Sequence, residues 1–260
     1  ALDPFTSERT AFGITFDSPR YRQQRILYPL IVWALSLGRP EAIPWVLIAV
    51  NFAALCVIAW LGGEYARRAG RHAIWGLAFP LYTGFLLTLS RDLTEIVEAC
   101  CVLGAFDAVR RGRQWRGAGL LTLAILAKET ALLVAVGAFL AWCLGRRRAS
   151  AEIKPQLFLV PIAVFVAWQA WLIWTWGAGP SKEIQSNVGF PFASFAPFVA
   201  ETFGLAGKFR LKTSIEVFLI LLSIGSVALT LRATRGMLVE RASCVLCAGL
   251  VVSLTRSVWC

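Results

Sequence analysis

Charged residues within an apolar part of the sequence have a spacing that could build a binding site. Arg91, Glu95 and Glu98 follow i, i+4, i+7 spacing, which puts them on one face of a helix, and Asp92 lies at the edge of that face. A charge inside an apolar span is costly, so it needs a partner or a water-filled cavity. The group is therefore either a self-neutralising network that joins helices, or the wall of a cavity for a hydroxylated or phosphorylated substrate.

A second charged pair, Lys128 and Glu129, interrupts an apolar stretch that runs from Gly117 to Leu144. One interpretation is a simple helix turn at the outer surface of a membrane. The other is a cation placed at the membrane boundary, where a lipid phosphate would lie. A lysine can neutralise a phosphate as a compact point charge, and it can stabilise the charge that develops on a departing phosphate.

The N-terminal segment contains three arginines within six residues, at positions 20, 22 and 25, just before a short apolar stretch. They either anchor the chain to anionic headgroups or recognise a phosphate through guanidinium forks. Asp3 and Asp17 are the carboxylates available here for general base catalysis. Asp3-Pro4 and Asp17-Ser18-Pro19 are also typical of turns, so the spacing selects neither residue.

The sequence gives little sign of a metal or cofactor site. His72 is the only histidine, and Cys244 and Cys247 have C-x-x-C spacing without a second pair or a nearby histidine. No Walker motif and no Gly-x-Ser-x-Gly motif occurs. We therefore predict no metal site and no resident cofactor, and a divalent ion is left open without a ligand cluster to support it.

The elements that must position these residues are long apolar segments. The chain has 260 residues, of which 58% are hydrophobic and only 16% are charged. Soluble domains average about 45–50% apolar and about 25% charged residues, so a polytopic membrane protein is favoured. The net charge of +11 comes from basic clusters between apolar blocks. That pattern is typical of the positive-inside rule, and we do not expect binding to nucleic acid.

We predict an all-α fold, a transmembrane bundle of about seven spans in one module that covers residues 1–260. The expected apolar segments are Ile43–Gly62, Ala73–Ser90, Leu93–Val109, Gly117–Ala127 with Ala131–Leu144, Leu157–Trp176, Val217–Leu231 and a last, partial one from Ser243. The two short pieces that flank Lys128 are expected to be half-helices or a tilted hairpin. Ile26–Leu37 is too short to span, and we expect an interfacial or re-entrant helix on the outer side.

The basic clusters predict the orientation of this bundle. Loops at 63–72, 110–116, 145–155 and 232–241 hold more than half of the 26 lysines and arginines, so they are expected to face the cytoplasm. Residues 1–42, with the interfacial helix, and the aromatic loop 177–213 are then expected on the outer side.

The order of these features resembles the GT-C superfamily of membrane glycosyltransferases, in particular its bacterial mannosyltransferase-like members. The segments that carry the resemblance are residues 1–6 (ALDPFT), 21–30 (YRQQRILYPL), 91–95 (RDLTE), 127–130 (AKET) and 187–192 (NVGFPF). The resemblance implies an enzyme that moves a sugar from a polyprenyl-phosphate donor to a lipid, glycan or protein acceptor. It implies a multi-pass protein of the bacterial cytoplasmic membrane, whose active side faces the periplasm or exterior.

The resemblance also assigns roles to residues. It makes Arg22, Arg25 and Lys128 candidates for binding the donor phosphate. The four charged residues at 91, 92, 95 and 98 become candidates for the cavity. It further implies that the first helix and the catalytic aspartate precede Ala1, so that Asp3 and Asp17 are only substitute candidates and this chain alone is expected to be inactive.

Two other classes of function are kept open by the sequence. A polytopic transporter or lipid flippase would use Glu98 and Asp107 as proton or substrate sites within the membrane. A non-catalytic membrane subunit, or another lipid-modifying enzyme, would need none of the residues above in these roles.

Overall fold

The computed structural model describes residues 10–11, 14–15, 23–81, 85, 89, 94–146 and 153–177, and every structural statement below concerns these residues. The described part is helical, as the sequence predicted. It also contains a hairpin that was not expected, formed by two strands of two residues each, β1 (Thr10–Ala11) and β2 (Ile14–Thr15).

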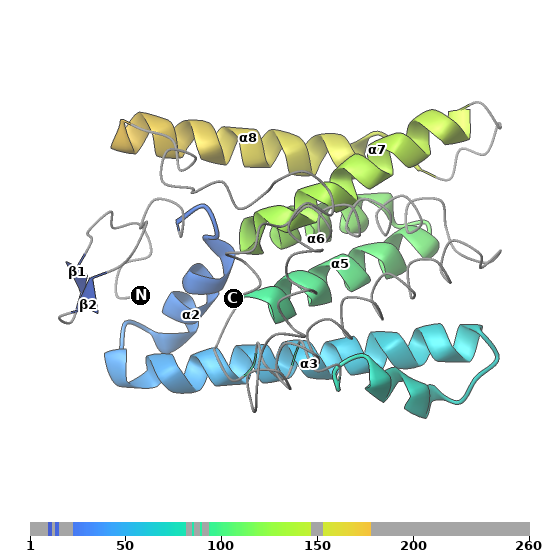
Figure 1. Ribbon diagram of the computed structural model, residues 1–260, viewed down its shortest axis with the longest axis horizontal. Coiled ribbons are helices and arrows are strands. Elements are labelled where there is room, and N and C mark those ends of the chain that lie inside the picture. Colours follow the sequence, from blue (N-terminus) through green and yellow to red (C-terminus); the bar gives the residue numbers. More distant parts are fainter. Residues whose placement is uncertain are drawn as a thin grey trace, which may run out of the picture.

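Six α-helices and three short 3-10 helices make up the described bundle. The α-helices are α2 (Leu27–Ser36), α3 (Ile43–Arg68), α5 (Glu95–Arg110), α6 (Gln114–Ala127), α7 (Leu132–Arg146) and α8 (Gln156–Trp176). The 3-10 helices are η1 (Pro40–Ala42), η2 (Ala73–Ala78) and η3 (Glu129–Ala131). Figure 1 shows α3 and α8 as the two long edges of the bundle, with α5 and α6 between them.

Two apolar clusters hold these helices together. One lies between α6, α7 and α8, and it includes Leu121, Ala135 and Leu157. The other lies between α2, α3 and α5, and it also contains Ala127, the last residue of α6. The end of α6 is therefore packed against the second cluster, which places the residues that follow it beside α2 and α5.

Two of the described helices are long and apolar enough to cross a membrane by length and composition, namely α3 with the η1 turn before it, and α8. In each, only 22% of the most apolar 18-residue window is buried inside the protein. Large apolar side chains on both helices are exposed as a result; they include Trp45, Phe52, Trp60, Leu159, Val166 and Trp174.

The expected span Ala73–Ser90 begins differently from the prediction. Its first residues form the 3-10 helix η2, which lies against the end of α3. This close approach needs glycine, because a Cβ on Gly76 would come within 2.1 Å of the backbone nitrogen of Gly63. Most of the remaining span falls outside the described residues, as do the expected loop 177–213 beyond Gly177 and both expected spans after it.

The predicted short helix at Ile26–Leu37 is present as α2. It ends where Leu37 adopts the left-handed conformation, with φ of 51°. Two hydrogen bonds attach it to α3: the Tyr28 hydroxyl donates to the carbonyl oxygen of Leu47 at 3.1 Å, and the Asn51 amide donates to that hydroxyl at 2.8 Å. One face of α2 is thus docked on α3, while Trp33 and Leu35 are exposed.

The arginine-rich turns lie at one end of the bundle. The Asp107 carboxylate binds Arg68 at 2.6 Å and Arg111 at 2.7 Å, which joins the ends of α3 and α5. The guanidinium of Arg110 lies over the ring of Tyr65, with its carbon 4.9 Å from the ring centroid. Figure 1 shows that α7 ends and α8 begins at this same end. The described parts of the turns at 63–72, 110–116 and 145–155 are therefore grouped in space, whereas the turn at 232–241 falls outside the described residues. The membrane side that these turns face stays a prediction.

Candidate functional site

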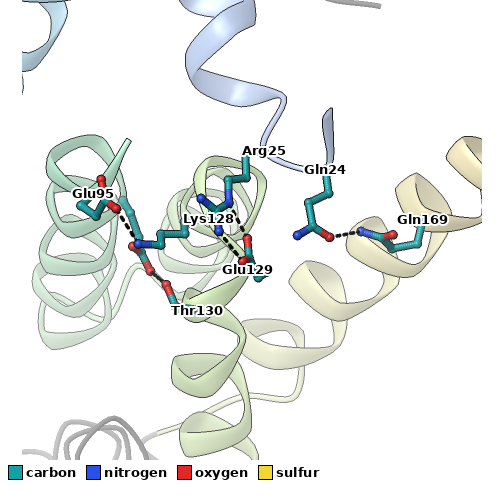
Figure 2. Close-up of polar contacts among 8 residues, drawn as sticks. Gln24, Arg25, Glu95, Lys128, Glu129, Thr130 and Gln169 are labelled. Carbon is teal, nitrogen blue, oxygen red and sulfur yellow. Dashed lines mark hydrogen bonds and ion pairs between the residues drawn. The ribbon is translucent and has the colours of Figure 1, made fainter. Parts of the chain in front are cut away.

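The candidate site is built around a break between α6 and α7. The helix α6 ends at Ala127, Lys128 is extended with φ of −157° and ψ of 133°, and η3 follows before α7 begins at Leu132. An extended residue between helices turns successive side chains in different directions. Lys128, Glu129 and Thr130 can therefore reach partners on other elements (Figure 2).

Two of these side chains bind the first turn of α5. The Lys128 ammonium lies 2.6 Å from a carboxylate oxygen of Glu95, and the Thr130 hydroxyl donates to Glu98 at 2.5 Å. The spacing of Glu95 and Glu98 predicted a shared helix face, and both carboxylates do meet the same segment. Arg91 and Asp92, which were predicted on this face, fall outside the described residues.

The third side chain binds the segment before α2. Arg25 donates two hydrogen bonds to Glu129, from Nε at 2.8 Å and from a terminal nitrogen at 2.6 Å. This is the bidentate geometry that makes arginine–carboxylate pairs strong. Arg25 and Lys128 were predicted separately as phosphate-binding residues. The break brings the two cations near each other, because Arg25 binds Glu129, the residue that directly follows Lys128. Arg22, Asp3 and Asp17 fall outside the described residues.

Two glutamines extend this polar row, and the sequence analysis missed both. The Gln169 amide of α8 donates to the side-chain oxygen of Gln24 at 3.5 Å, across 145 residues of sequence. One signal could have pointed to Gln169, because it is the one amide in the interior of α8 and a polar side chain in an apolar span needs a partner. Gln24 could have been suspected only from its place next to Arg25.

The charges of the described row nearly cancel. Three carboxylates, on Glu95, Glu98 and Glu129, face the cations of Arg25 and Lys128. These contacts join α5, the α6–α7 break and the segment before α2. The network of Arg91 and Asp92 with these glutamates, which the sequence allowed, stays a prediction. The second carboxylate oxygen of Glu95 is buried without a hydrogen-bond partner, so the described contacts leave acceptor capacity unused.

The row lies part-way along α3, at the start of α5, and the outer membrane surface at which the sequence placed Lys128 stays a prediction. The helix α3 has 26 residues and α5 has 16 residues. At about 1.5 Å per residue, α5 is about 15 Å shorter. Because Asp107 ties their ends together, the start of α5 lies about 15 Å short of the start of α3. Figure 1 shows that α5 and α7 both begin part-way along α3, with α2 beside their ends.

The described residues give no metal centre. Within them, no group of three or more His, Cys, Asp or Glu side chains is arranged to hold a metal ion. Instead, Glu95 binds Lys128, and Glu98 accepts a hydrogen bond from Thr130. The arrangement is suited to exchange of ion-pair partners, in which an entering anion takes the place of a carboxylate at Lys128 or Arg25.

Comparison with known proteins adds no further constraint on the site. No family model, curated protein or solved structure matches this chain, so the function is argued from the residues themselves.

Proposed function

We propose that this chain belongs to an integral membrane glycosyltransferase with a GT-C-like bundle of about seven spans. In this proposal a sugar moves from a polyprenyl-phosphate donor to a lipid, glycan or protein acceptor. The reaction takes place on the outer side of the bacterial cytoplasmic membrane. The supports are the lipid-compatible surface of the helices, the placement of the arginines, and the cations of the polar row.

The membrane part of the proposal rests on how exposed side chains are distributed. Four of the exposed tryptophans lie towards the two ends of the bundle, with Trp45 and Trp174 at one end and Trp75 and Trp115 near the arginines at the other, while Trp60 lies between the ends on α3. Tryptophan is enriched at both bilayer interfaces. From Trp45 to Arg67 on α3 the distance is about 33 Å at 1.5 Å per residue, which matches a hydrocarbon core of about 30 Å.

The observation that carries the catalytic part is the position of Lys128. Its ammonium group is only partly exposed, lies at the break between two helices, and is paired with Glu95 at 2.6 Å. A phosphate that displaced Glu95 would meet a cation in a site of low dielectric, where the interaction is stronger than in water. The same cation would then stabilise the charge on the departing polyprenyl phosphate as the bond to the sugar breaks.

The depth of the row suits a lipid-linked donor. The polyprenyl tail of such a donor stays in lipid, whereas its phosphate and sugar need polar partners. A polar row that lies within the bundle, about 15 Å from the outer end of α3, offers these partners without requiring the tail to leave the bilayer. Arg25, which lies next to this row, supplies the second candidate cation for the phosphate.

The alternative of a transporter has less support from the geometry. Asp107 is held by Arg68 and Arg111 at the arginine-rich end of the bundle. It lies nine residues after Glu98 on α5, which is about 14 Å along the helix. The two acids proposed for transport therefore do not form one site, and Asp107 has the contacts of a residue that joins helices.

The test is a transfer assay in membranes that contain the full protein. A panel of radiolabelled polyprenyl-phosphate sugars, carrying mannose, glucose, galactose, N-acetylglucosamine or arabinose, is supplied with native acceptor lipids. Lys128→Ala should lower the transfer rate by about 10²–10³-fold, the usual loss when a preorganised electrostatic contact is removed. The matched control is Lys154→Ala, at an exposed lysine before α8 at the arginine-rich end, which should stay within twofold of wild type.

Membrane insertion of each variant is checked by fractionation. If wild type transfers no sugar of the panel, the proposed function is wrong. If Lys128→Ala is as active as Lys154→Ala, the assignment of Lys128 is wrong.

A further inference from the structure

The strongest unexplained feature of the site is the side chain of Gln24. It is only 5% exposed, and its amide nitrogen has no hydrogen-bond partner. Figure 2 shows this nitrogen on the side of Gln24 that faces Arg25 and Glu129, while the amide oxygen faces Gln169. Burying an amide donor without a partner is unfavourable, so it is retained where a ligand or a bound water completes it.

The other member of the glutamine pair is also weakly satisfied. Gln169 reaches Gln24 only at 3.5 Å, the long limit of a hydrogen bond. The residue before it, Trp168, has a buried indole N–H without a partner, and its ring stacks on Trp171 with centroids 4.8 Å apart. This part of α8 thus carries neutral hydrogen-bonding groups and flat apolar rings, in contrast to the charged groups of the α6–α7 break.

We infer that Gln24 and Gln169 form the neutral part of the site, which binds the hydroxyl groups of a sugar. An amide offers one donor pair and one acceptor, and a hydroxyl group can both donate and accept, so each amide can pair with sugar hydroxyls. A buried amide donor without a partner, such as that of Gln24, discriminates strongly in favour of a ligand that completes its hydrogen bonds. The inference rests on the proposed function and names which residues hold the glycosyl group of the donor.

The geometry fits one donor molecule across the two parts of the site. Gln24 is adjacent in sequence to Arg25, and Glu129 binds Arg25 next to Lys128. In a sugar-phosphate donor the phosphate is bonded directly to the sugar ring, so the groups that bind them must be neighbours. The charged row then holds the phosphate, and the two glutamines hold the sugar.

The experiment measures lipid binding by the full protein in nanodiscs. Comparing probes with and without a sugar separates binding by the charged row from binding by the two glutamines. One probe is polyprenyl phosphate without a sugar, and the others are the five sugar-bearing lipids of the transfer panel. Wild type should bind at least one sugar-bearing lipid at least tenfold more tightly than polyprenyl phosphate. Gln24→Ala and Gln169→Ala should reduce this preference to within twofold and leave the affinity for bare polyprenyl phosphate unchanged.

The controls keep the outcome interpretable. Gln156→Ala, at the other end of α8, should keep the preference of wild type. Lys128→Ala should weaken the binding of all probes equally. For the glutamine variants, affinity for bare polyprenyl phosphate reports whether the protein is folded. If Gln24→Ala loses this affinity, the preference measured with Gln24→Asn and Gln169→Ala decides the question.

Three results would overturn the inference. If both glutamine variants keep the full preference, these residues do not bind the sugar. If wild type binds bare polyprenyl phosphate but prefers none of the sugar-bearing lipids, the glutamine subsite is wrong while the phosphate site stands. If wild type binds no probe at all, the proposed function itself fails, and the subsite fails with it.

Discussion

Exchanging the charges of Lys128 and Glu95 distinguishes a structural ion pair from a substrate-binding cation. The variant Lys128→Glu/Glu95→Lys keeps an ion pair between the break and α5, but it moves the positive charge onto the helix. If Lys128 acts only through its contact with Glu95, the exchange should preserve both stability and activity. If Lys128 binds the donor phosphate, the exchange should preserve stability alone.

The magnitude follows from the burial of the pair. The Lys128 side chain is 18% exposed and that of Glu95 is 31% exposed, with the charged atoms 2.6 Å apart. Breaking a buried pair costs about 3–5 kcal/mol, whereas an exposed pair contributes about 0–1 kcal/mol. For this partly exposed pair we expect a loss of about 2–3 kcal/mol in each single variant, Lys128→Glu and Glu95→Lys, and recovery of most of that loss in the double variant.

The assays are thermal unfolding in detergent and the transfer reaction in membranes. The double variant should regain most of the melting temperature of wild type, while its transfer rate should stay about 10²-fold or more below wild type. A double variant with a transfer rate within threefold of wild type would refute the phosphate role and leave Lys128 as a structural residue. A double variant that regains neither property would refute the ion pair itself.

Two further predictions concern the packing of η2 on α3 and the orientation of the bundle. Gly76→Ala should lower the free energy of unfolding by about 1–3 kcal/mol or more, because its Cβ would lie 2.1 Å from the Gly63 nitrogen; Gly119→Ala, with no atom within 4 Å, should be neutral or stabilising in the same melting assay. For the orientation, a cysteine-free protein with R39C should react in intact cells with an impermeant maleimide, whereas R113C and K154C should not. All three positions are exposed, so the opposite pattern would reverse the proposed topology.

The parts of the fold that depend on local pattern could be predicted from the sequence. The apolar run from Ile43 predicted α3, and the short length of the segment Ile26–Leu37 predicted the short helix α2. The expected bounds of the helix before Arg110 differ by only two residues at its start and one at its end from those of α5. Apolar length and flanking charge decide these features, and both are visible in a single sequence.

The features that depend on neighbours were harder to predict. The six residues from Ala73 are as apolar as the start of a span, yet they form η2 because glycines on both sides allow a close backbone contact with α3. The pairing of Arg25 with Glu129 joins residues 104 positions apart, and nothing local in either segment specifies it. The same holds for Gln24, whose partner lies on the last described helix.

The long sequence separation inside the site has a consequence for how the protein is made. Arg25 leaves the ribosome 104 residues before Glu129, and Gln24 leaves 145 residues before Gln169. At about 5–20 residues per second, several seconds of synthesis separate the two halves of each contact. Lys128 and Glu95, only 33 residues apart, can pair much sooner. The partners of the site therefore become available in the order of synthesis, first the pair on α5 and the α6–α7 break, and last the glutamine contact on α8.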